Sequence, residues 1–128
     1  MKILLDTHAF IWWDGNVAKL SSKALQVCQD PENTLVLSTV SIWEMQIKHQ
    51  IGKLKLNLPL HDIVEAQQKT NGIEVLPVIP PHVFALTSLP LYHKDPFDRL
   101  IIAQAKVEKA ALLSCDSAVQ QYPVEIVW

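Results

Sequence analysis

Four acidic residues stand where their carboxylates could act together. Each lies at the edge of an apolar segment rather than in a polar stretch: Asp6, Glu44, Asp98 and Asp116. A carboxylate beside a core segment is energetically costly unless it is paired or binds a metal. Although the four are scattered along nearly the whole chain, we expect the fold to gather them around one divalent cation.

Each of these acids also has a simpler structural interpretation. Asp6 could cap the helix expected after the first strand, and Glu44 could form an ordinary helical ion pair with Lys48. Asp98 could simply favour a helix dipole, and Asp116 could cap a short helix. Metal binding is the better account of Glu44, because this residue ends an apolar stretch that we expect to face the core.

Neighbouring residues are given structural roles. Asp95 is interpreted as a helix cap, and His93 as a surface histidine in a proline-rich loop. Trp12, Trp13 and Trp43 are expected in the core or at an interface rather than as platforms for base stacking.

Composition restricts the class of protein. A length of 128 residues, about half of them apolar, predicts one domain spanning residues 1–128. No apolar run approaches the roughly 18 residues of a membrane-spanning helix, and no signal sequence is evident, so a cytoplasmic protein is expected. The isolated Cys28 and Cys115 suit a reducing compartment and are expected in or near the core. A net charge of −2 gives no global sign of nucleic-acid binding, so any such contact must be local.

Apolar runs and turn residues predict alternating strands and helices. Strands are expected at residues 2–5, 35–38, 73–76, 112–114 and 124–127. Helices are expected at 8–13, from Ser21 or Ser22 to Cys28, from a Ser41 cap to near Gly52, at 61–70, 80–86 and 96–110, and briefly from Asp116. The clearest start is at Asp95-Pro96, where a capping residue precedes a proline suited to the first helical position.

Short, continuously apolar strands separated by helices indicate an α/β fold with a parallel sheet covered on both faces. In such sheets ligands gather at the carboxyl ends of strands, and Asp6 and Asp116 both follow strands. With only three glycines, the chain offers neither a dinucleotide fingerprint nor a P-loop.

Four segments together are similar to one known family. They are Leu4-Leu5-Asp6-Thr7-His8, Ser38-Thr39-Val40-Ser41-Ile42-Trp43-Glu44, Asp95-Pro96-Phe97-Asp98-Arg99-Leu100-Ile101-Ile102-Ala103-Gln104-Ala105 and Leu113-Ser114-Cys115-Asp116. In order and approximate spacing they resemble the PIN-domain ribonucleases, especially VapC-type toxins. One departure is that the last motif often carries threonine ahead of its acid, where this chain has Ser114-Cys115.

The resemblance implies a Mg²⁺- or Mn²⁺-dependent endoribonuclease with Asp6, Glu44 and Asp98 as its first three acids and Asp116 as its fourth. Such cations prefer carboxylate and water oxygens, and a bound cation would activate water and neutralise phosphate charge. The resemblance also implies an RNA substrate, a small antitoxin protein as inhibitor and a homodimer, while the short apolar runs predict no membrane association. We expect supporting or substrate-positioning roles for Thr7, Ser114, Lys48 and Arg99. Lys53, Lys55 and Lys94 are expected, together with Arg99, to position the RNA backbone.

Other classes of protein fit the sequence less well. A catalytically silent PIN-like module that binds RNA or protein is the main alternative, and it would have no need to keep four costly carboxylates together. The aspartate phosphatases need a second aspartate two positions after the first, where this chain has His8. A receiver domain needs a nucleophilic aspartate after the third strand, and Leu76-Pro77-Val78 offers none.

Overall fold

The computed structural model describes residues 1–128 and is built around a parallel sheet of five strands in the order β3-β2-β1-β4-β5. This confirms the predicted α/β class. The elements in chain order are β1 (Lys2–Leu5), α1 (Thr7–Gly15), η1 (Val17–Lys19), α2 (Ser22–Gln29), β2 (Thr34–Ser38), α3 (Thr39–Gln50), α4 (Leu60–Asn71), β3 (Glu74–Leu76), α5 (Pro80–Ala85), η2 (Leu86–Ser88), α6 (Pro96–Glu108), β4 (Ala111–Leu113), η3 (Val119–Gln121) and β5 (Ile126–Val127). None of the helices combines the length and apolar character needed to cross a bilayer.

The central strands bury apolar side chains on both faces of the sheet. Leu4 is in register with Val36 of β2 and Leu112 of β4, and all three belong to the apolar cluster that includes α6. Ile3 and Leu5 belong to a second cluster with residues of α1, α2 and α4. Because successive strand residues point to opposite faces, only a continuously apolar strand can supply both clusters. Each such side chain stabilises the fold by about 1.5–3 kcal/mol when fully buried.

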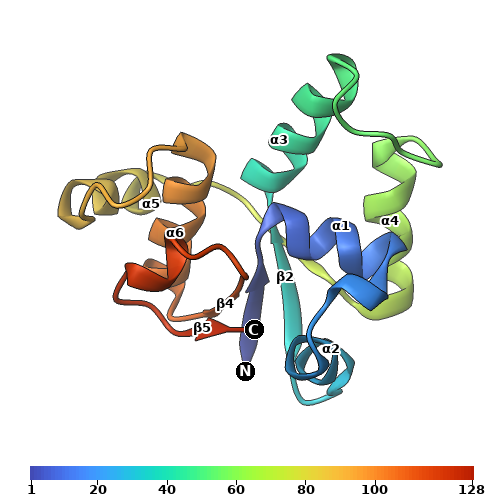
Figure 1. The fold of residues 1–128 in the computed structure, drawn as a ribbon, viewed down its shortest axis with the longest axis horizontal. Coiled ribbons are helices and arrows are strands. Elements are labelled where there is room, and N and C mark those ends of the chain that lie inside the picture. The colour runs from blue at the N-terminus through green and yellow to red at the C-terminus, as the bar shows by residue number, and fades with distance from the viewer.

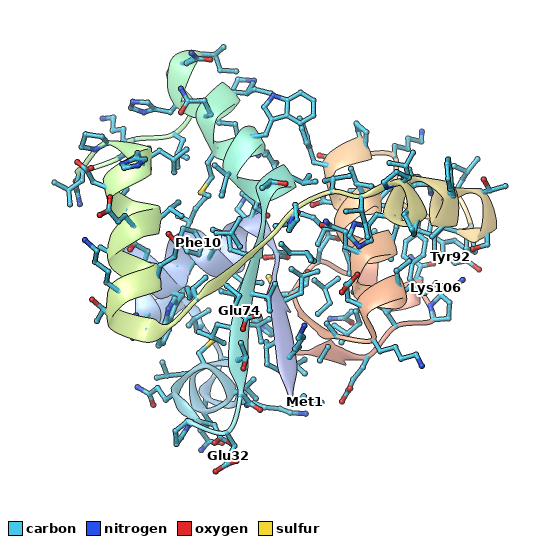
Figure 2. All side chains as sticks on the ribbon, turned by 180° about the vertical axis from the view of Figure 1, so that it is seen from behind. Met1, Phe10, Glu32, Glu74, Tyr92 and Lys106 are labelled. Atoms are coloured by element: carbon cyan, nitrogen blue, oxygen red, sulfur yellow. The ribbon has the colours of Figure 1, made fainter.

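Helices cover the two faces in unequal groups. Figure 1 shows α1, α2 and α4 on one side of the sheet and α5 and α6 on the other. Helix α3 extends from the carboxyl end of β2 and contacts both α1 and α6, so it bridges the two groups. Seen from behind, Phe10 lies in the interior, whereas Glu32 and Tyr92 lie at the periphery (Figure 2).

Helix ends follow local rules, with one correction. Side chains accept backbone hydrogen bonds at the starts of α1, α2, α3 and α6, from Asp6, Ser21, Ser38 and Asp95 respectively. The prediction that Ser41 caps α3 is wrong, because Ser38 Oγ accepts the Val40 N–H at 3.0 Å and the helix therefore begins earlier. Ser41 is instead fully buried in the first turn. Gly72, with φ 65°, ends α4 in the left-handed conformation that the sequence predicted.

One expectation about exposure is wrong, because Cys115 lies outside the core. Trp43 lies outside the core too, and its expected place at an interface stays a prediction. Trp43 is 59% exposed, although Glu44 beside it is buried, because neighbouring residues of a helix point about 100° apart. The Trp43 ring meets Phe97 edge-on, with 5.0 Å between ring centroids. Cys115 is exposed rather than near the core, whereas Cys28 is buried as predicted.

The strand order defines one special edge of the sheet. β2 and β3 lie on one side of β1, and β4 and β5 lie on the other. In open parallel sheets ligands collect at the carboxyl ends of the strands where the order reverses, which is here between β1 and β4. Asp6 follows β1 directly, and its N–H donates to the Leu113 carbonyl of β4 at 3.1 Å. The topology therefore places Asp6 and the segment leading to Asp116 at the same edge, as predicted.

Candidate metal centre

Asp6 lies at the carboxyl end of β1 and is only 9% exposed. Its Oδ1 accepts the Ala9 N–H at 2.7 Å, so the simple interpretation as a helix cap is correct. Burial raises the pKa of this carboxyl, although hydrogen bonds from the Ser114 hydroxyl and from Ala9 act in the opposite direction. The negative charge of Asp116 raises it further. Asp6 is therefore a cap that also carries a costly charge.

Glu44, on α3, is 3% exposed and faces the residue that follows Asp6. The Thr7 hydroxyl donates to Glu44 Oε1 at 2.6 Å and lies 3.0 Å from the Ser41 hydroxyl. On its other oxygen, Glu44 accepts from Lys48 Nζ at 2.7 Å, which is the ordinary helical ion pair. This contact orders Lys48, and Thr7 joins the end of β1 to α3.

Asp98 lies in the first turn of α6, behind the Asp95 cap, which confirms the predicted helix start. Burial raises the pKa of Asp98 to about 7, and the negative charges of Asp95, Glu44 and Asp6 add to the rise. The electrostatic effect of Glu44 and Asp6 shows that three of the sequence-predicted acids lie within range of one another. At pH 7 Asp98 is therefore only partly ionised, because no positive charge beside it fully offsets burial and its acidic neighbours.

Asp116 follows β4 after two residues and is the most exposed of the four, with 38% of its side chain accessible. Its N–H donates to Ser114 Oγ, and its Oδ1 accepts the Ala118 N–H at 2.9 Å. The expected short helix therefore begins only at Val119, after this turn. Although burial raises the pKa of Asp116, hydrogen bonds from His93 and Ala118 outweigh burial and lower it.

His93 is the residue that sequence reasoning placed wrongly. Its side chain is 15% exposed, and its Nε2 lies 3.0 Å from Asp98 Oδ2 and 2.9 Å from Asp116 Oδ2. The only sequence signal was its position two residues before the Asp95 cap, which brings it close to the start of α6. The contact with Asp116, 23 residues away, depends on the tertiary fold.

Arg99 holds the loop that carries His93. Its guanidinium donates to the Pro90 carbonyl at 2.8 Å and to the Tyr122 hydroxyl at 3.2 Å. These contacts commit Arg99 to the protein, so its geometry favours loop support over the substrate-positioning role that was predicted. The other basic residues expected to contact the substrate, Lys53, Lys55 and Lys94, are exposed.

The donor set fits a hard divalent cation. Asp98 and Asp116 offer ligand atoms within 4.8 Å of each other, Asp6 and Glu44 lie within electrostatic range of Asp98, Asp95 adds a fifth negative charge nearby, and Lys48 is the one lysine paired with any of the four. Oxygen ligands with excess negative charge suit Mg²⁺ or Mn²⁺. A second group of possible ligands on α4, His61, Asp62 and Glu65, is largely exposed and is already paired through Glu65 with Lys69, so it fits a cation less well.

Comparisons with known proteins show the family and the fold. A family model described as PIN domain matches residues 3–125. Ribonuclease VapC22 of Mycobacterium tuberculosis (strain ATCC 25618 / H37Rv) is 27% identical over 104 residues, which are 80% of this chain and 78% of that protein. The structure of VapBC2 from Rickettsia felis, bound to a DNA fragment from their promoter, matches with a TM-score of 0.70 at 17% identity, covering 98% of this chain and 97% of that one.

A further solved structure shares the same fold. VapBC-1 from nontypeable Haemophilus influenzae matches with a TM-score of 0.65 at 19% identity, over 98% of this chain and 96% of that chain. At such low identity these structural likenesses concern the fold, whereas the family match covers nearly the whole sequence.

Proposed function

The chain belongs to the PIN-domain family, and on this premise we propose that it is an endoribonuclease that depends on a divalent cation. The observation that carries the proposal is the state of Asp98. Its pKa is raised to about 7 by burial and by the negative charges of Asp95, Glu44 and Asp6. A cation among these carboxylates would remove that penalty, because an opposite charge nearby favours the ionised form.

In this proposal Asp6, Glu44, Asp98 and Asp116 hold Mg²⁺ or Mn²⁺. When bound, such a cation neutralises charge on a phosphodiester and lowers the pKa of water that it coordinates. Asp6 and Asp98 are the principal carboxylates, because neither has a lysine partner in the chain. Asp116 already accepts hydrogen bonds on both oxygens, so it orients the site more than it binds.

Other residues of the chain support these carboxylates. Thr7 holds Glu44 through a 2.6 Å hydrogen bond, and Lys48 holds its other oxygen. Ser114 contacts both Asp6 and the backbone of Asp116 and so joins the ends of β1 and β4. We assign to these three residues the role of keeping the carboxylates in place.

RNA is the proposed substrate, and exposed lysines are proposed to contact its phosphates. Lys94 directly follows His93 at the rim of the acidic cluster, and Lys53 and Lys55 lie on the connector between α3 and α4. Phosphate contacts position a nucleic acid without reading its sequence. The name of the 27% identical relative, a ribonuclease, supports RNA over other phosphodiesters.

The substitution Asp6→Asn tests the catalytic role without removing the cap. Asparagine caps a helix about as well as aspartate, so α1 should be retained while the negative charge is lost. We expect Asp6→Asn to abolish Mg²⁺- or Mn²⁺-dependent cleavage of an RNA panel. Asp30→Asn is the matched control, because the exposed Asp30 likewise accepts a backbone N–H with Oδ1, from Glu32 at 2.9 Å, far from the acids.

Two outcomes distinguish the proposal from a catalytically silent RNA- or protein-binding module. Cleavage by the native protein that stops on addition of a chelator supports the nuclease. RNA binding without cleavage, at any concentration of either cation, would establish the silent module instead. Full activity in Asp6→Asn contradicts the assignment of Asp6.

We further propose that the protein is the toxin of a toxin-antitoxin pair, inhibited by a small antitoxin protein, and that it forms a homodimer. The named VapBC complexes among the structural relatives support a protein partner. Large apolar side chains also remain exposed, including Phe84 at 71% and Leu91 at 83%, as expected of a surface that another protein covers. Induced expression should arrest growth, whereas Asp6→Asn should not. A solution mass of twice 14.4 kDa would support the dimer.

A further inference from the structure

The His93 imidazole occupies a place that the four-acid description of the site leaves unexplained. One nitrogen, Nε2, lies within hydrogen-bond distance of two carboxylates, at 3.0 Å from Asp98 and 2.9 Å from Asp116. The ligand atoms of these three residues all lie within 4.8 Å of one another. On distances alone His93 could be either a metal ligand or a hydrogen-bond donor to the metal-binding carboxylates.

The second ring nitrogen decides between these two roles. The backbone N–H of Asp95 donates to His93 Nδ1 at 3.1 Å. A ring nitrogen that accepts a hydrogen bond carries no hydrogen, so the neutral imidazole must carry its hydrogen on Nε2. Nε2–H then faces the two carboxylates as a donor and has no lone pair to offer a metal ion.

The surrounding loop holds the ring in this orientation. The His93 N–H donates to the Tyr122 hydroxyl at 3.0 Å, and that hydroxyl donates to the Pro90 carbonyl at 2.7 Å. Asp95, which fixes the tautomer through its N–H, also caps α6 through its side chain. A single residue therefore sets both the donor of His93 and the start of the helix that carries Asp98.

The carboxylates keep room for a cation while this donor is in place. Nε2–H hydrogen-bonds Asp116 Oδ2, which keeps a second lone pair, whereas Asp98 Oδ2 lies 3.0 Å from the same nitrogen as an electrostatic contact. Asp98 Oδ1 accepts no hydrogen bond from the chain, whereas Asp116 Oδ1 accepts from Ala118. The close contact with His93 therefore positions Asp98 without using either of its carboxylate oxygens as a hydrogen-bond acceptor.

We propose that His93 is a positioning residue of the metal centre, whose Nε2–H holds Asp98 and Asp116 in the orientation that binds the cation, and that it is not itself a ligand. This inference rests on the proposed function of the same site. Hydrogen-bond partners of metal ligands typically contribute a factor of about 10–100 in metal affinity.

The chain contains a matched control in His82. Its Nδ1 accepts the Ile79 N–H at 3.1 Å, and its Nε2 lies 2.9 Å from Glu108 Oε2. The arrangement is similar to that at His93, except that Nε2 faces one carboxylate instead of two and Nδ1 also lies 3.3 Å from Gln104 Nε2. Glu108 ends α6 and lies about 15 Å along the helix from Asp98 at 1.5 Å per residue. Substitution of His82 therefore disturbs a similar hydrogen bond far from the acids.

The decisive measurement is the affinity for Mn²⁺ of the purified full chain, by calorimetric titration at pH 7.5. We expect His93→Ala to weaken binding about 10–100-fold, and His93→Gln to recover most of the loss, because the glutamine amide reaches the position of Nε2–H. His82→Gln should leave the affinity of the folded protein unchanged. Thermal unfolding without metal measures the structural cost of each change separately.

A second measurement needs no variant. Pulsed electron paramagnetic resonance of Mn²⁺ bound to the native protein should show no directly coordinated ¹⁴N, and a directly bound imidazole nitrogen would overturn the proposal. Native affinity in His93→Ala would overturn it as well, while leaving the nuclease proposal intact. Absence of Mn²⁺ binding by the native protein would overturn both.

Discussion

The charge of Asp98 should make the metal-free protein less stable as the pH rises. In the unfolded chain this carboxyl ionises around its ordinary pKa of 3.8, whereas in the folded protein the pKa is raised to about 7, chiefly by burial. Between these values the folded state binds the proton and the unfolded state has released it. The free energy of unfolding therefore falls with rising pH across this window and levels off above about 7.

The size of the effect follows from the same values. At about 1.4 kcal/mol for each pKa unit, the interval from 3.8 to about 7 corresponds to about 4 kcal/mol as an upper value. The side chain is 23% exposed, and solvent screening reduces the figure to about 2 kcal/mol at the lower end. Asp98→Asn also loses a favourable interaction with the start of α6, but this contributes only about 0.3–1 kcal/mol.

We therefore expect Asp98→Asn to be more stable than the native protein at pH 8 by about 2 kcal/mol, with the difference vanishing near pH 4. Urea unfolding in the presence of a chelator, at several pH values, measures this directly. Asp62→Asn, which alters an exposed carboxylate on α4, should follow the native curve. If the native protein and Asp98→Asn lose stability in parallel from pH 4 to pH 8, the unneutralised charge at Asp98 does not exist and the main support for a cation is removed.

Three further predictions concern the residues that support the site. Lys48→Met should lower the free energy of unfolding by about 1–2 kcal/mol, because Glu44 is left buried with only Thr7 as partner. Added Mn²⁺ should then raise the melting temperature of Lys48→Met more than that of the native protein. An equal rise in both would contradict the placement of Glu44 in the metal site. Tyr122→Phe should cost about 1–3 kcal/mol in urea unfolding, because its hydroxyl accepts two hydrogen bonds and donates a third, and a neutral result would show that water replaces it. Ser38→Ala should destabilise the protein by about 1 kcal/mol through loss of the α3 cap, whereas Ser38→Thr, which keeps the hydroxyl with one added methyl group at this buried site, should cost less, and an equal loss would argue against capping as the cause.

Local sequence rules account for much of the secondary structure and for the acids themselves. Asp95-Pro96 predicts the start of α6, Asn71-Gly72 predicts the end of α4, and the continuously apolar strands predict a sheet buried on both faces. The structure corrects the start of α3 because both Ser38 and Ser41 are residue types that cap helices, and only the backbone path selects Ser38.

The sequence by itself determined the residue types, namely four isolated carboxylates beside apolar segments, and their places at strand and helix ends. Only the tertiary structure decided how they are neutralised and what faces them. Glu44 meets Thr7 from 37 residues away, and His93 reaches Asp116 across 23 residues. Such contacts depend on strand order and helix packing, because a hydrogen bond requires atoms about 3 Å apart and no local pattern encodes a separation of that size between distant segments.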